Sequence, residues 1–189
     1  SSDDCIVCAV GKYKNATMQT SDTCITCGAG KYNDDPATSA DKHDALDDCK
    51  ACGAGKYLTD SSGNADEHDN ETDCSDCPTG SGTNSQTGQD EHDDCNASSG
   101  YSGKGSSVSA CAAGKYKEAD FDDKGCDDCA EDTYKASTAQ TASSDCTSCP
   151  TGSGTNSQTG QDEHVDCKAD PGFSGEGSTV VACAAGSFK

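Results

Sequence analysis

Apolar side chains are sparse along this chain, and most of them lie within a few residues of a cysteine. The stretches between cysteines are polar and rich in Ser, Thr, Asn and Asp. We find no segment with the three- to four-residue apolar spacing of an amphipathic helix. The pattern predicts a small disulfide-rich fold, an elongated tandem array of cysteine-rich modules. These modules should be mostly coil with short β-hairpins and essentially no helix.

The cysteines are followed by a regular pattern of glycine and aromatic residues. Six Cys-x-x-Cys pairs occur, and Cys95, Cys111, Cys167 and Cys183 stand singly. Counting from the second cysteine of each pair, and from Cys111 and Cys183, the third residue is Gly except at Asp132. Gly at this place permits a tight turn. In six of the eight cases the fifth residue is aromatic, begins an extended segment and can lay its ring over the disulfide. These residues are Tyr13, Tyr32, Tyr57, Tyr116, Tyr134 and Phe188, whereas Gly82 and Gly154 stand at the other two places.

A long internal repeat divides the chain. Residues 74–117 and 146–189 align without a gap at an offset of 72, with 32 of 44 positions identical. A long period built on cysteines is typical of a repeat array. We therefore predict three units in residues 1–73, a first copy of a 72-residue repeat in residues 74–145, and a truncated second copy in residues 146–189.

Composition makes the cysteines the source of stability. Leu, Ile, Val and Phe together number 13 of 189 residues, and Trp is absent. Such a chain cannot bury enough apolar surface to offset the entropy of ordering. A disulfide that closes a loop of this size contributes about 3 kcal/mol. Sixteen cysteines so used indicate an oxidising compartment, outside the cell or at its surface.

The net charge of the chain limits the kinds of molecule that it can bind. The net charge is −21, and all 13 basic residues are Lys. Nucleic-acid binding needs a basic face, so we exclude it. An acidic surface can attract Ca²⁺ or basic partners, or serve only as a solvated surface. We see no apolar run of about 20 residues, so we predict no membrane span in this segment, which is either mature or part of a larger chain.

The motif Cys-x-x-Cys-x-x-Gly-x-Tyr, followed by another Cys-x-x-Cys, resembles the ephrin-receptor-like cysteine-rich repeat, a relative of tumour-necrosis-factor-receptor-type modules. Cys52-Gly-Ala-Gly-Lys-Tyr57 and Cys111-Ala-Ala-Gly-Lys-Tyr116 are close matches, and the resemblance covers nearly the whole chain. It implies elongated, extracellular and non-catalytic modules.

The resemblance also implies a disulfide pairing, although sequence alone does not fix connectivity. Each second cysteine of a pair joins the next cysteine downstream, giving Cys8–Cys24, Cys27–Cys49, Cys52–Cys74, Cys77–Cys95, Cys111–Cys126, Cys129–Cys146 and Cys149–Cys167. Cys5 and Cys183 remain and would pair outside the segment, so we expect a longer array or a head-to-tail polymer.

Two cysteines of the related repeats are missing together in both copies. Ala97 and Val108 occupy these places in the first copy, and Ala169 and Val180 in the second. Our hypothesis is that an apolar contact within each pair replaces one disulfide.

Three metal sites are conceivable from the residues. Cys5/Cys8 and Cys24/Cys27 have zinc-ribbon spacing, but the single cysteines form no tetrads. Each histidine follows an aspartate by two residues, including His43, which could give a metal site or a pH-sensitive contact, or merely a repeated surface turn. The candidate ligands are Asp66, His68, Asp90, His92, Asp162 and His164. Part of a calcium loop is present at Asp120, Asp122, Asp123 and Gly125, without its bidentate Glu. We expect no cofactor, with Ca²⁺ the candidate ion.

Three Asn-x-Ser/Thr motifs begin at Asn15, Asn70 and Asn96, although some such matches arise by chance in a chain rich in Ser and Thr. No catalytic motif is present, and we expect no enzyme activity.

The first functional hypothesis is a glycosylated structural subunit or segment of an extracellular fibre or surface appendage, whose partners are itself or neighbouring repeats. The alternatives are a stalk or ligand-binding ectodomain of a receptor or adhesion protein, and a secreted acidic array that binds a metal such as Ca²⁺.

Overall fold

The computed structural model describes residues 7–14, 24–59, 63–122 and 124–187. Within these ranges the chain forms nine two-stranded sheets and nine three-residue 3-10 turns, with no α-helix. Each sheet joins two strands that follow one another in sequence, so each is a hairpin. The predicted fold class, small disulfide-rich modules in tandem, is confirmed. None of the helical turns in these ranges has the length and apolar character needed to cross a membrane.

Every strand is two residues long. The strands are β1 (Lys12–Tyr13), β2 (Ile25–Thr26), β3 (Lys31–Tyr32), β4 (Lys50–Ala51), β5 (Lys56–Tyr57), β6 (Ser75–Asp76), β7 (Ser81–Gly82), β8 (Asn96–Ala97), β9 (Tyr101–Ser102), β10 (Ser109–Ala110), β11 (Lys115–Tyr116), β12 (Asp127–Asp128), β13 (Thr133–Tyr134), β14 (Thr147–Ser148), β15 (Ser153–Gly154), β16 (Lys168–Ala169), β17 (Phe173–Ser174) and β18 (Val181–Ala182).

The 3-10 turns precede the second strand of most hairpins. They are η1 (Ala40–Lys42), η2 (Leu46–Asp48), η3 (Ala65–Glu67), η4 (Glu71–Asp73), η5 (His92–Asp94), η6 (Gly105–Ser107), η7 (Ser143–Asp145), η8 (His164–Asp166) and η9 (Gly177–Thr179). The aspartate before the cysteine closes several of these turns. Asp48 Oδ2, for example, accepts the N–H groups of Asp44 and Ala45 at 2.9 and 2.8 Å. Asp at this place therefore stabilises the turn by accepting backbone N–H groups.

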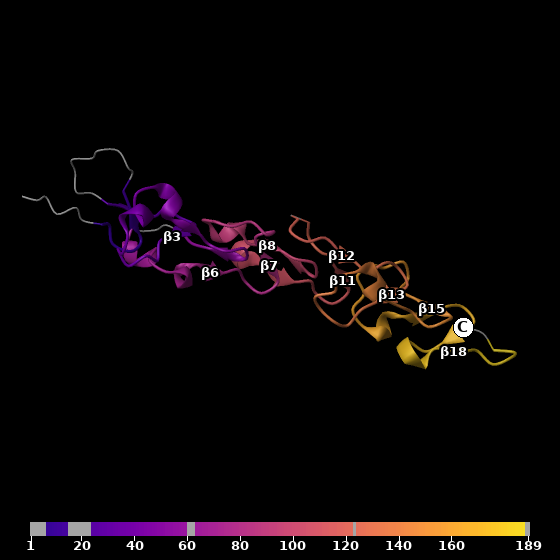
Figure 1. Cartoon of the computed structure of the whole chain (residues 1–189). Helices are drawn as coiled ribbons and strands as arrows, with labels where there is room; N and C mark the ends of the chain where they lie inside the picture. The colour runs from indigo at the N-terminus through magenta and orange to yellow at the C-terminus, as the bar shows by residue number, and fades with distance from the viewer. Residues whose placement is uncertain (1–6, 15–23, 60–62, 123, 188–189) are drawn as a thin grey trace, which may run out of the picture. The chain divides into compact units, whose positions relative to one another are not determined.

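We number the hairpins as modules 1 to 9. Their residues are 8–26, 27–51, 52–76, 77–96, 97–110, 111–128, 129–148, 149–168 and 169–182. The chain divides into two compact units: unit 1 is residues 1–78 with 82–95, and unit 2 is residues 79–81 with 96–189. The two strands of a module lie beside each other, as β11 and β12 do in Figure 1.

Seven disulfides each close a loop within one module. They join Cys8–Cys24, Cys27–Cys49, Cys52–Cys74, Cys77–Cys95, Cys111–Cys126, Cys129–Cys146 and Cys149–Cys167. These are the pairs that the resemblance implies. Cys183 is in no disulfide, and Cys5 lies outside the described residues.

Modules 5 and 9 have the same hairpin without a disulfide. The N–H of the cysteine that follows module 5, Cys111, bonds Gly100 O of that module at 2.9 Å, as the N–H of Cys27, which follows module 1, bonds Gly11 O at 2.8 Å. Val108 follows η6 just as Cys49 follows η2. Ala97, which is fully buried, and Val108 thus take the places of the two cysteines. Their direct contact stays a prediction.

The buried apolar residues are mainly the cysteines themselves, with Tyr32, Leu58 and Ala97. Tyr32 forms a buried cluster with Leu58 and the Cys52–Cys74 disulfide. We expected each ring to cover a disulfide, and Tyr32 packs with that of the following module. The expected extended segment at the aromatic is also present, in β1, β3, β5, β11 and β13, while Phe188 lies outside the described residues.

Candidate functional site

Two backbone hydrogen bonds recur at several junctions between consecutive modules. The N–H of the turn glycine bonds a carbonyl of the next module, as Gly30 bonds Leu58 at 2.8 Å. The carbonyl belongs to the residue that directly follows the aromatic. That residue in turn donates its N–H to the module after it, as Leu58 donates to Gln89 O at 3.0 Å. We call this pattern the relay. At the junctions into modules 4 and 8 the first bond runs instead to a threonine hydroxyl, from the Gly55 N–H to Thr83 Oγ1 at 2.8 Å and from the Asp132 N–H to Thr155 Oγ1 at 2.9 Å.

The turn glycines also lie against the second module along. A Cβ placed on Gly30 would come within 2.3 Å of Gly88 O, and one on Gly114 within 2.2 Å of Gly160 O. Both glycines have positive φ, at +73° and +77°, a region that disfavours any side chain. Two separate constraints therefore require glycine at these places. One is the positive φ, and the other is the carbonyl oxygen of the second module along, which leaves no room for a Cβ.

Asp132, the exception to the glycine rule, has a structural explanation. Gly55 occupies the same place in module 3, and nothing lies within 4 Å of a Cβ placed on it. Two modules beyond Gly55 and Asp132 come the short modules 5 and 9. Asp132 keeps a positive φ of 60°, and its Oδ1 accepts the Thr155 N–H at 2.9 Å. Free space at this place thus admits a carboxylate.

The four histidines fall into two structural classes. His43 and His68 lie six residues before the cysteine that closes their module, and both are buried. His92 and His164 lie three residues before it, and are half-buried. The shared Asp-x-His pattern therefore does not define one site, because the distance to the following cysteine decides where the ring points.

His43 is the centre of a buried polar network between modules 1 and 2. Its Nδ1 lies 2.7 Å from Lys12 O, and its Nε2 lies 3.2 Å from Asp35 Oδ1. Both neighbours are hydrogen-bond acceptors, so the ring lies between an acceptor of module 1 and one of its own module. Asn33 Nδ2 donates to Lys42 O at 2.9 Å and also approaches His43 Nδ1, at 3.3 Å. His68 repeats one of these contacts, with Nδ1 at 2.8 Å from Lys31 O.

Glutamine replaces this histidine in modules 4, 7 and 8, at Gln89, Gln140 and Gln161. The backbone carbonyls keep the relay, accepting N–H groups from Leu58, Lys117 and Lys135 at 3.0 Å. The side chains turn back to their own loops instead, as Gln140 Nε2 does to Thr138 O at 2.6 Å. Only the main chain of this position is shared by the two types of junction.

The second class of histidine stacks on tyrosine. The rings of His92 and Tyr57 are 4.9 Å apart at an interplanar angle of 20°. His164 and Tyr134 repeat this arrangement at 4.8 Å and 13°. Each stack joins consecutive modules, so these histidines too serve junctions.

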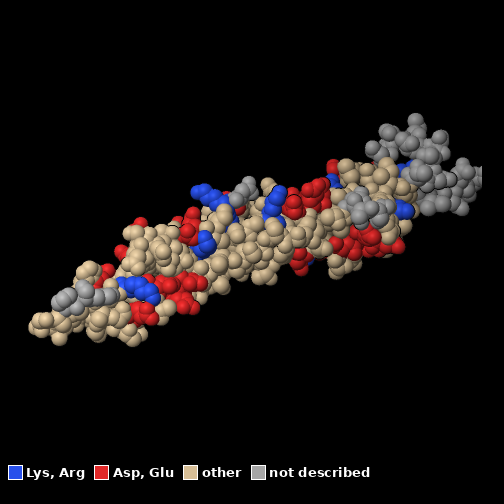
Figure 2. Space-filling view, turned by 180° about the vertical axis from the view of Figure 1, so that it is seen from behind, with Lys and Arg blue, Asp and Glu red and all other residues tan. Residues whose placement is uncertain are grey.

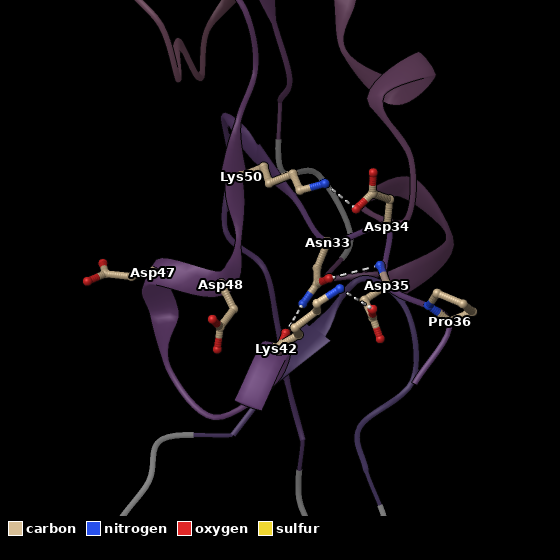
Figure 3. Close-up of a pocket in the computed structure, with 8 residues that line it drawn as sticks. All are labelled: Asn33, Asp34, Asp35, Pro36, Lys42, Asp47, Asp48 and Lys50. Carbon is tan, nitrogen blue, oxygen red and sulfur yellow. Dashed lines mark hydrogen bonds and ion pairs between the residues drawn. The ribbon is translucent and has the colours of Figure 1, made fainter. Parts of the chain in front are cut away.

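A polar pocket of about 480 Å³ lies beside the network of module 2 (Figure 3). Its lining is Asn33, Asp34, Asp35, Pro36, Lys42, Asp47, Asp48 and Lys50. Ion pairs join Lys50 Nζ to Asp34 Oδ1 at 2.6 Å and Lys42 Nζ to Asp35 Oδ2 at 3.3 Å. Asp47 points away from the other side chains (Figure 3).

The charges of this pocket are held by hydrogen bonds. The Thr38 N–H, 2.9 Å from Asp35 Oδ1, holds the pKa of Asp35 far below its usual value, although burial opposes the shift. The side chains of Thr38, His43 and Lys42 add to the lowering of this pKa. Pairing with Asp34 raises the pKa of Lys50. Asp35 is therefore an ionised, nearly buried carboxylate that contacts His43, the residue whose ring reaches Lys12 O of module 1.

The histidines among the predicted metal ligands lie at module junctions, His68 in a buried position and His92 and His164 in the tyrosine stacks. In the described residues no three or more His, Cys, Asp or Glu side chains gather as a metal-binding group. Of the calcium-loop residues, Asp120 Oδ1 accepts the Ser99 N–H at 2.6 Å and Asp122 pairs with Lys117 at 3.0 Å. Asp123 lies outside the described part of the chain. Figure 2 shows Asp and Glu in several clusters with Lys beside them.

Lys117 is a structural residue that we did not predict. Its side chain is 2 % exposed, and its Nζ bonds Ala97 O at 3.4 Å and Asp122 O at 3.2 Å besides its ion pair. These contacts hold the loop of module 6 against module 5, and the Phe121 N–H adds a bond to Ala97 O at 2.8 Å. A lysine next to a tyrosine carries no sequence signal of burial, because Lys135 has the same setting and is only half-buried.

The three glycosylation motifs have different surroundings. Asn70 is exposed in the turn before Cys74, and Asn96 is half-buried in β8. Asn15 lies outside the described residues. No protein-family model matches this chain, and no curated protein matches it. Cysteine-rich tandem modules of disulfide-linked β-hairpins are therefore the description that the structure supports, and seven disulfides indicate an oxidising, extracellular environment.

Proposed function

We propose that this chain is a non-catalytic structural repeat protein, a subunit or segment of an extracellular fibre or surface appendage. The observation that carries the proposal is the relay, which recurs at several junctions between modules of different loop length and side-chain composition, with a threonine hydroxyl as one acceptor at the junctions into modules 4 and 8. A junction of this kind can be extended by any number of modules, as in other repeat proteins. The buried histidines and the tyrosine stacks contribute to junctions, which favours a structural role over catalysis or cofactor binding.

The proposed partners are further modules of the same kind, in a longer chain or in other copies. The acidic surface supports this environment, since a net charge of −21 keeps such an array soluble. The resemblance to ephrin-receptor-like repeats supports the extracellular setting and also the alternative of a receptor stalk.

The test is a non-reducing peptide map of protein from its own source, following the partners of Cys183 and Cys5, with electron microscopy of the same material. A disulfide between Cys183 of one copy and Cys5 of another, in material that forms filaments, would support the fibre. Partners in further sequence of the same chain, without filaments, would favour the stalk. Free thiols throughout would overturn both.

A further inference from the structure

We propose that Asn70 carries an N-linked glycan. The proposal rests on the extracellular location in the proposed function, because N-glycans are attached to secreted chains. Of the two motifs in the described residues, it selects Asn70 over Asn96 on structural grounds. These grounds concern the amide nitrogen, its neighbours and the tolerance of this place in the fold.

The side chain of Asn70 is exposed with its nitrogen available. Its Oδ1 accepts the Thr72 N–H at 3.1 Å and the Thr72 hydroxyl at 3.3 Å. Within the described part of the chain, no hydrogen bond engages Asn70 Nδ2. The oxygen of the amide is thus held by the Thr of the motif itself, and the nitrogen that would bond the sugar faces solvent.

Other modules show that the fold does not depend on the side chain at this place. The residue four positions before the closing cysteine is Ala45 in module 2, Glu91 in module 4, Ala142 in module 7 and Glu163 in module 8. Each precedes the same 3-10 turn. A position that accepts a methyl group or a long carboxylate without change of the turn also has room for a sugar directed into solvent.

Asn96 differs in each of these respects. It lies in β8 between Cys95 and Ala97, which are both 0 % exposed, and it forms a β-bridge with Lys104. A glycan on Asn96 would be attached to a half-buried strand residue that is adjacent in sequence to the disulfide-bonded Cys95. The structure therefore favours Asn70 over Asn96.

The reaction is the ordinary glycosyl transfer to an amide. A C1–Nδ2 bond forms at Asn70 while the C1–O bond of a lipid-linked glycosyl diphosphate breaks. The diphosphate leaves with the electron pair of that bond, and the amide nitrogen loses one proton. No oxidant or reductant takes part.

The experiment uses full-length protein from its own source. An amidase that removes N-glycans converts a glycosylated Asn to Asp, and in H₂¹⁸O it labels that residue. We expect the label at Asn70 and none at Asn96. In the same host, with Asn15→Gln as the common background, Asn70→Gln and Thr72→Ala should abolish the change in electrophoretic mobility that the amidase causes, whereas Asn96→Gln and Thr72→Ser should retain it.

The outcomes separate this proposal from the proposed function. An unlabelled Asn70 in secreted, disulfide-bonded protein would overturn the glycan and leave the structural role standing. Label at Asn96 instead of Asn70 would also overturn it. Protein recovered inside the cell with free thiols would overturn the proposed function and this inference together. Should Asn70→Gln fail to fold, the Thr72 pair still decides, because only Thr72→Ala destroys the motif.

Discussion

Units 1 and 2 use the same relay but support it with different side chains. Unit 1 contains 20 acidic residues and six Lys, whereas unit 2 contains 14 and seven, so that their net charges are −14 and −7. Two junctions of unit 1 enclose a buried histidine, His43 or His68. The equivalent residues of the other modules are glutamines, Gln89 in unit 1 and Gln140 and Gln161 in unit 2, and their side chains turn back to their own loops. Unit 2 also contains modules 5 and 9, which lack a disulfide, and the buried Lys117.

The difference shows which features the array requires. Backbone hydrogen bonds, turn glycines and the spacing of the cysteines occur in both units, while histidine, glutamine, lysine and even a disulfide are interchangeable supports. Modules can therefore diverge in sequence without changing how they join, provided that the backbone hydrogen bonds of the relay and the close contacts of the turn glycines remain.

The largest effect should come from a side chain on a turn glycine. We expect Gly30→Ala to lower the free energy of unfolding by about 3–5 kcal/mol, since it combines a positive φ with a Cβ 2.3 Å from Gly88 O. Gly55→Ala, in open space in the same unit, should cost only about 1–2 kcal/mol. Denaturant unfolding with the disulfides intact measures both. Equal losses would show that the second-neighbour approach is unimportant.

A new disulfide in module 5 should give this module of unit 2 the kind of cross-link that the modules of unit 1 have. Ala97→Cys with Val108→Cys should form a bond that closes a loop of about 12 residues and raises the free energy of unfolding by about 3 kcal/mol. Thiol counting and thermal unfolding, with the two single variants as controls, check this. Two persistent thiols would contradict the placement of this pair at a cystine position.

Removing the buried amine should weaken module 5 in particular. Lys117→Met loses the bonds to Ala97 O and Asp122, and we expect a loss of about 2 kcal/mol. Lys135→Met is the matched control, because Lys135 also follows a tyrosine but is half-buried, and it should change stability by less than about 0.5 kcal/mol. Hydrogen exchange of the Phe121 amide should rise only in the first variant.

Exchanging the junction histidine tests whether the two types of junction are equivalent. His43→Gln copies the residue of modules 4, 7 and 8, and should lose about 1–2 kcal/mol because the contacts with Asp35 and Lys12 O disappear. His92→Gln, which removes one ring of a half-buried stack, should lose about 0.5 kcal/mol. A larger loss from His92→Gln than from His43→Gln would reverse our ranking of the two classes.

The smallest expected effect is a change in how the stability of module 2 responds to acid when Asp35 is replaced. The folded-state pKa of Asp35 is lowered, so its contribution to stability is fully present above the unfolded value of about 3.9 and is lost as the pH falls below it. We expect Asp35→Asn to flatten the dependence of Tm on pH between about pH 5 and 2, measured by scanning calorimetry. An unchanged slope would mean that other carboxylates dominate the acid response.

Sequence reasoning anticipated features set by local chemistry. Gly at the third position after the cysteine predicts the turn, and the observed positive φ of Gly11 and Gly30 confirms it. Ala97 and Val108 were found by comparing the repeats. The shared Asp-x-His pattern does not distinguish the two classes of histidine, because the ring's surroundings depend on the distance to the next cysteine and on the carbonyls of another module. The exception at Asp132 depends on a module two places away, so no local motif contains it.

The placement of the disulfides has a mechanical consequence. Each of the seven disulfides in the described part of the chain closes a loop inside its own module, so a pulling force on the main chain cannot draw out those loops while the bonds are oxidised. Modules 5 and 9 have no such bond, and each can release a segment of about 12 residues, roughly 40 Å when extended. In both copies of the 72-residue repeat, extensibility is therefore confined to one module, whose resistance depends on hydrogen bonds such as those of Lys117.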